Sequence, residues 1–95
     1  MNIKVFKLTT GEEIIAEVVS ESDSRVSVKS ALSIVLQPSQ QGISYGFVPW
    51  GNLVEEDKTL PTANIIYSGK PKDDLLNNYN SIFGGIMVAP KQLIT

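Results

Sequence analysis

The chain contains neither cysteine nor histidine. Without cysteine it can form no disulfide, no thiolate nucleophile and no zinc–thiolate site. Without histidine it lacks the most common general base and the most common metal ligand of proteins. These absences argue against the usual hydrolases and metalloenzymes. We therefore expect a protein that is not an enzyme and needs no cofactor.

Long apolar runs and an excess of positive charge are also missing. No run approaches the roughly 20 apolar residues that cross a bilayer, and no signal-peptide pattern follows Met1. Eight basic and ten acidic residues give a net charge of −2, whereas nucleic-acid-binding modules are usually strongly basic. A cytoplasmic protein with no membrane partner is the expectation.

The 95 residues, 42% of them hydrophobic, suffice for one domain spanning 1–95. Residues 2–8 alternate in polarity and residues 14–19 are rich in β-branched types, so both segments are expected to form strands. Thr9-Thr10-Gly11 separates them, and Gly11 can adopt the positive φ of a tight hairpin.

Three further segments read as strands. Residues 25–30 alternate, with Val26 and Val28 facing inward, and the apolar residues 31–36 predict a strand covered on both sides or bent around the core. Residues 43–48 follow a turn, and Gly46 predicts a bulge or bend within them.

The second half of the chain contains the one predicted helix. Residues 51–62 are polar and acidic and are predicted to leave the sheet. The last strand of the sheet is predicted at 63–67. Pro71 suits the first position of a helix over 71–83, followed by an apolar stripe at helical spacing: Leu75, Leu76, Tyr79, Ile82 and Phe83. Gly84 can end this helix, and a short terminal strand is expected at 86–88.

Two groups of acidic residues are candidates for a catalytic or metal-binding site. Adjacent residues of a strand point to opposite faces, so Glu12 and Glu13 cannot form one carboxylate pair and read instead as solvated charges at a hairpin end. Glu55-Glu56-Asp57 lacks the spaced ligands and glycine of a calcium loop and reads as a solvated loop.

Aromatic and basic residues are the basis for a prediction of nucleic-acid binding. Tyr45, Phe47 and Trp50 can stack on bases, although their spacing beside aliphatic residues favours packing. Four basic residues flank turns, where they serve either as phosphate contacts or as ordinary solvated surface: Arg25, Lys29, Lys70 and Lys72.

Four stretches together resemble the Sm-like (LSm) fold: KLTTGEEIIAEVV from Lys7, the turn ESDSR, the strand VSVKSALSIVL and the late IIYSG. The chain is similar to the small Sm-like proteins of cyanophages and ocean metagenomes over residues 2–69, and in the phage group the likeness extends to the helix. The resemblance implies a mainly β fold: a small, strongly bent five-stranded antiparallel Sm-like barrel with one C-terminal helix.

The resemblance also implies a function. It predicts a homo-oligomeric ring of about five to seven copies in which residues 43–48 of one copy pair with 63–67 of the next. RNA or other single-stranded nucleic acid would meet loops at the pore, here Asp23, Arg25, Ser68, Gly69 and Lys70. Ser68-Gly69 stands where the family has Arg-Gly, so uridine-specific binding is not implied. The alternative is a phage structural or assembly ring without nucleic acid, and either would act in the host cytoplasm if phage-encoded.

Overall fold

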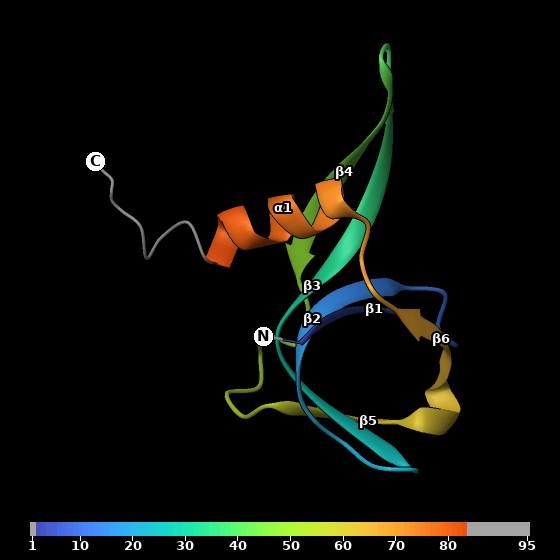
Figure 1. Ribbon diagram of the computed structural model, residues 1–95, viewed down its shortest axis with the longest axis vertical. Coiled ribbons are helices and arrows are strands. Elements are labelled where there is room, and N and C mark those ends of the chain that lie inside the picture. The colour runs from blue at the N-terminus through green and yellow to red at the C-terminus, as the bar shows by residue number, and fades with distance from the viewer. Residues whose placement is uncertain (1, 84–95) are drawn as a thin grey trace.

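The computed structural model describes residues 2–83 and is dominated by antiparallel strands (Figure 1). The elements in chain order are β1 (Ile3–Leu8), β2 (Glu13–Glu21), β3 (Arg25–Ser39), β4 (Gly42–Pro49), β5 (Lys58–Pro61), the 3-10 helix η1 (Thr62–Asn64), β6 (Ile65–Gly69) and α1 (Asp73–Phe83). The mainly β fold with one C-terminal helix is thus confirmed. The strand predicted at 86–88 lies outside the described residues.

The sheet has six strands rather than the predicted five. Its order is β4-β3-β2-β1-β6, and β5 pairs with the first half of β3. Residues 51–62 were predicted to leave the sheet, but Thr59 and Leu60 pair with Ser27 and Val26, and Leu60 is buried. The sequence of β5, KTLP, has one leucine and ends in proline, so it shows none of the alternation by which a strand is predicted.

The sheet is strongly bent and remains open. The strands β1, β2, β3, β5 and β6 curve around a common centre (Figure 1). Within residues 2–83, β6 pairs only with β1 and β5 only with β3, so no ladder joins β5 to β6.

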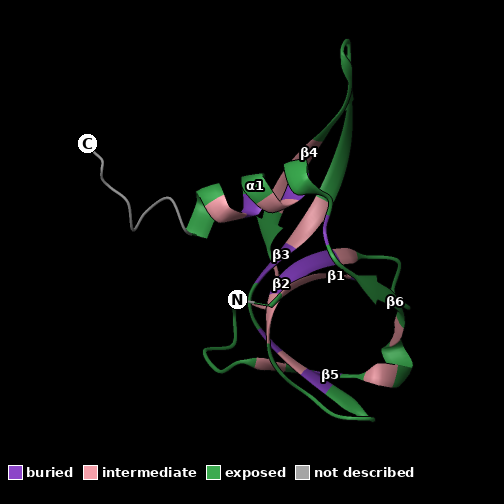
Figure 2. Cartoon of the chain, in the orientation of Figure 1, coloured by how far each residue is buried: buried purple, intermediate pink, exposed green. Residues whose placement is uncertain are grey.

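Both faces of the sheet carry a core (Figure 2). The concave face buries Phe6, Leu8, Ile14, Ala16, Val26, Val28, Ala31 and Leu60. The opposite face, covered by α1, buries Ile15 and Leu32 against Leu75 and Tyr79. This two-sided burial explains why three consecutive residues of β2, from Ile14 to Ala16, are all buried.

A β-bulge at Ser30 bends β3. Glu17 pairs with Lys29, but two residues earlier Ile15 pairs with Leu32, so β3 contains one extra residue. Ser30 has a φ of 53° in this bulge. Residues 31–36 were expected to be covered on both sides or bent around the core: Ala31 and Leu32 are buried in the two different cores, the bend lies just before them at Ser30, and Val35 and Leu36 are exposed. The bulge predicted at Gly46 is wrong, because Gly46 pairs regularly with Val35.

Beyond the bulge, β3 and β4 form a long hairpin arm, whose outer half we define as residues 36–45 (Figure 1). One face of the arm is apolar, because Leu36 lies opposite Tyr45 and Pro38 opposite Ile43. Leu36 and Ile43 are 52% and 68% exposed. The arm is therefore amphipathic, and its outer apolar face is uncovered by residues 2–83.

The helix α1 begins two residues later than predicted. The Lys72 carbonyl accepts the first helical hydrogen bond from the Leu76 N–H at 2.9 Å, and Pro71 is buried ahead of it. The predicted apolar stripe is confirmed at Leu75 and Tyr79, which are buried. Gly84, its expected terminator, is not among the described residues, and none of the helices in 2–83 is long and apolar enough to cross a membrane.

Candidate nucleic-acid interface

The turn that carries Asp23 and Arg25 is held in place by hydrogen bonds within the turn and by hydrogen bonds from η1. Within the turn, the Ser22 N–H donates to the Arg25 carbonyl at 2.8 Å and the Arg25 N–H to Ser22 Oγ at 3.2 Å. From η1, Thr62 Oγ1 donates to the Asp23 carbonyl at 3.1 Å and the Thr62 N–H to the Ser24 carbonyl at 2.9 Å. The turn 22–25 therefore lies beside η1, with the Arg25 side chain exposed.

The second predicted group, Ser68 to Lys70, lies at the opposite end of β6. Ser68 pairs with Phe6 and Gly69 with Val5, whereas Ile65, next to η1, pairs with Leu8. At about 3.3 Å per residue the two ends of this strand are roughly 13 Å apart. The structure therefore does not bring the two predicted groups together in one copy.

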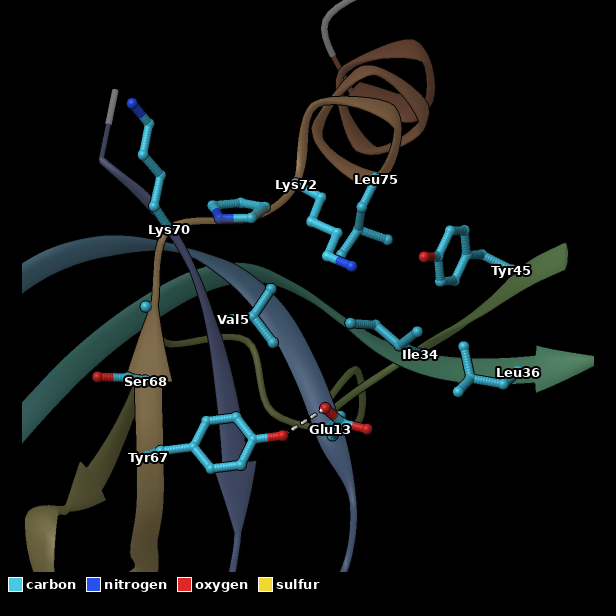
Figure 3. Close-up of a pocket in the computed structure, with 12 residues that line it drawn as sticks. Val5, Glu13, Ile34, Leu36, Tyr45, Tyr67, Ser68, Lys70, Lys72 and Leu75 are labelled. Atoms are coloured by element: carbon cyan, nitrogen blue, oxygen red, sulfur yellow. Dashed lines mark hydrogen bonds between the residues drawn. The ribbon is translucent and has the colours of Figure 1, made fainter. Parts of the chain in front are cut away.

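A groove of about 320 Å³ opens beside Ser68, Gly69 and Lys70, between β6, the arm and the start of α1 (Figure 3). Its apolar lining comes from Val5, Ile34, Leu36 and Leu75, and its tyrosines are Tyr45 and Tyr67. These residues belong to five different elements. The groove is mostly apolar and open to solvent.

Charged groups occupy both sides of the groove. Tyr67 donates its hydroxyl hydrogen to Glu13 Oε2 at 2.9 Å, and this bond, with a smaller effect of burial, raises the pKa of Tyr67 above its ordinary value. Lys72 points its ammonium into the groove, whereas Lys70 lines the edge and points away (Figure 3). The groove therefore offers a carboxylate and a cation across an apolar floor.

The aromatic residues pack as their spacing suggested. Trp50 packs against the concave core, and Tyr45 and Phe47 pack against the core beneath α1. Packing thus explains Trp50 and Phe47. Tyr45 is half-buried and also faces the groove.

The acidic residues form no shared site in the part of the chain that the structure describes. Glu12 accepts a hydrogen bond from Thr10 Oγ1 at 3.1 Å, whereas Glu13 is bonded to Tyr67. Residues 55–57 are exposed, and residues 2–83 contain no cluster of three acidic side chains suited to hold a metal ion. The separate placement of Glu12 and Glu13 agrees with their predicted independence.

Two features of the structure were not predicted from the sequence: the hydrogen bonds of Thr62, and the groove that brings Glu13, Tyr67 and Lys72 together. Thr62 lay in the segment predicted to leave the sheet, so its bonds to the turn 22–25 had no local signal. Lys72 was noted only as a basic residue near a turn, and Glu13 only as a solvated charge. No family model matches the chain, and no curated protein matches it either.

Proposed function

We propose that the chain is a non-enzymatic, ring-forming Sm-like protein that binds single-stranded nucleic acid, with RNA as its ligand. The observation that carries the proposal is a strongly bent open sheet whose two end strands, β4 and β6, each have a partner on one side only within residues 2–83. Such edges are liabilities that proteins cover.

Pairing β4 of one copy with β6 of the next covers the free edges of these two strands and repeats around a closed ring, whereas the short strand β5, which pairs only with β3 within residues 2–83, keeps its own free edge. Apolar side chains support this pairing, since Val48 on β4 is 52% exposed and Ile66 on β6 is 59% exposed. Exposed apolar residues on unpaired strands favour association.

The nucleic-acid contact in this proposal centres on Arg25. Its guanidinium is exposed on a turn that Thr62 fixes, so it can bind a phosphate without first ordering a loop. A ring repeats the contact in every copy, which raises affinity through effective concentration even for an acidic chain. Lys70 lies at the other end of β6 and adds a separate, smaller contribution.

The ring is tested by placing a charge on the β4 edge. Val48→Glu removes an apolar contact and sets a carboxylate at the proposed junction, and we expect it to yield monomers in light scattering coupled to gel filtration. Val19→Glu is the control, because Val19 is similarly exposed, at 48%, but lies on β2, which is not an end strand of the sheet. A Val48→Glu variant with the wild-type mass contradicts the proposed junction.

Fluorescence anisotropy with a labelled single-stranded RNA at low salt tests the ligand. Arg25→Gln should weaken binding about tenfold or more through loss of repeated phosphate contacts. Lys29→Gln removes a positive charge that is already ion-paired with Glu17 on the exposed strand surface, and should change affinity less than about twofold. Absence of binding near about 50 μM RNA, in the range of weak nonspecific affinities, contradicts the nucleic-acid reading.

One observation favours the alternative of an assembly ring without nucleic acid. The outer arm exposes Leu36 and Ile43 on one face, and such a strip suits protein contacts. Salt separates the two functions, because phosphate contacts release counterions and weaken steeply as salt rises.

A further inference from the structure

We propose that the groove between β6, the arm and α1 binds a nucleotide whose base carries an exocyclic amino group. The proposal goes beyond the ring and the Arg25 contact, because the residues that line the groove all belong to one copy. It follows from three features that lie together in Figure 3.

The first feature is a slot for a flat apolar body. Val5, Ile34 and Leu75 form an aliphatic surface, with Tyr45 and Tyr67 on its two sides (Figure 3). A volume of about 320 Å³ falls at the lower end of small-molecule sites. Heteroaromatic bases bind such surfaces through their faces, with aromatic side chains adding stacking.

The second feature is a cation for an anionic group. The Lys72 ammonium points into the groove, and across residues 2–83 the ion pairs formed are Lys4–Glu21 and Lys29–Glu17, so neither Lys70 nor Lys72 is neutralised there. A phosphate beside Lys72 gains a charge-assisted hydrogen bond. Fatty acids share this requirement, but they do not satisfy the third feature.

The third feature is a carboxylate with one oxygen available to accept a hydrogen bond from a ligand. Tyr67 bonds Oε2 of Glu13, which leaves Oε1 to accept from a ligand N–H. Adenine, cytosine and guanine each present an amino group, whereas the one donor on the pairing edge of uracil, N3–H, lies between two carbonyl oxygens that a carboxylate repels. Oxygen atoms that face each other without a hydrogen bond are costly to bury in a partly apolar site. The groove therefore favours amino bases over uracil.

Calorimetric titration of the full chain with adenosine monophosphate at low salt measures this directly. We expect a dissociation constant of roughly 0.1–1 mM and uridine monophosphate at least about tenfold weaker. No heat of binding with adenosine monophosphate up to about 5 mM overturns the proposal, as does equal affinity for the two nucleotides.

Three variants locate the binding. A Cβ added at Gly69 meets nothing within 4 Å, so Gly69→Leu can fill the groove without displacing backbone, and it should abolish binding. Lys72→Gln should weaken binding about tenfold, and the control Lys29→Gln less than about twofold. Glu13→Gln keeps an acceptor for Tyr67 but removes the charge, and the preference over uridine monophosphate should fall to less than about threefold. Binding that is unchanged in both Gly69→Leu and Lys72→Gln overturns the assignment.

Two further arms identify the source of the nucleotide and separate this site from the ring. If the nucleotide belongs to a single-stranded nucleic acid, an oligoadenylate should compete with adenosine monophosphate and bind at least about tenfold more tightly. If the free nucleotide is the ligand, the oligoadenylate and adenosine monophosphate should bind alike. Val48→Glu, which splits the proposed ring, should leave nucleotide affinity within about twofold, and a larger loss overturns a site contained in one copy.

Discussion

The Tyr79 hydroxyl of α1 donates a hydrogen bond of 2.7 Å to the carbonyl of Ser30, which is the one non-glycine residue between 2 and 83 with a positive φ. The bond joins the helix to the bulge at which β3 bends. Helix docking and strand curvature are therefore coupled, and the same helix and strand also line the groove, through Leu75 and Ile34.

Tyr79→Phe removes the hydroxyl from this contact. We expect it to lower the free energy of unfolding by about 1 kcal/mol, since one partly buried hydrogen bond is lost and the ring remains. Tyr45→Phe is the control, because the Tyr45 hydroxyl forms no side-chain hydrogen bond with another residue of 2–83, and it should change stability by less than about 0.5 kcal/mol. Urea unfolding measures both; equal losses in the two variants contradict the role of the Ser30 contact.

Alkaline pH provides a second test of Tyr79. Burial, with a smaller effect of the Glu17 charge, raises the pKa of Tyr79 to about 12. The folded state therefore holds this proton more tightly than the unfolded state, whose tyrosine pKa is about 10. The resulting stabilisation is fully present below about pH 10 and is lost as pH rises toward 12, on the order of 2 kcal/mol in all.

Lysines also titrate in this range, so the comparison requires Tyr79→Phe at each pH. The wild type should lose its advantage of about 1 kcal/mol over the variant as pH rises above about 10, and should become the less stable of the two as pH approaches 12. A difference that stays constant across that range contradicts the raised pKa.

Gly11 tests the first hairpin. Its φ is +98°, and a Cβ there meets nothing within 4 Å, so any cost of a side chain comes from backbone conformation alone. Gly11→Val should cost about 1–3 kcal/mol. Gly69→Val introduces the same side chain into strand β6, also in open space and without a positive φ, and should be neutral or slightly stabilising. Similar unfolding free energies for the two variants would exclude the turn conformation as the cause.

Local pattern predicted part of this fold. Alternation in residues 2–8, together with Gly11, was enough to predict the first hairpin, because each signal lies within it. In the structure Ile3 and Val5 pack against one core, and Phe6 and Leu8 lie in the other. The bulge at Ser30 escaped prediction because a left-handed residue is usually glycine, and the sequence offers serine there. A bulge or bend was predicted at Gly46 instead, and a bend around the core was one of the two interpretations of residues 31–36.

The site was harder to predict because it depends on contacts between distant residues. Thr62 bonds the turn at Asp23 across 39 positions, and Tyr67 bonds Glu13 across 54. Periodicity describes neighbours on one element and carries no information about such pairs. The Sm-like resemblance alone placed Ser68, Gly69 and Lys70 at the same pore as Arg25, and within one copy the two groups lie toward opposite ends of β6.

The mass of the native protein in solution tests the central claim most directly. The chain has a mass of 10.4 kDa, and the proposed pairing of β4 with β6 closes a ring of about five to seven copies. Light scattering coupled to gel filtration should therefore give a single species at that multiple, unchanged over a wide range of protein concentration. A species of 10.4 kDa at every concentration would contradict the account.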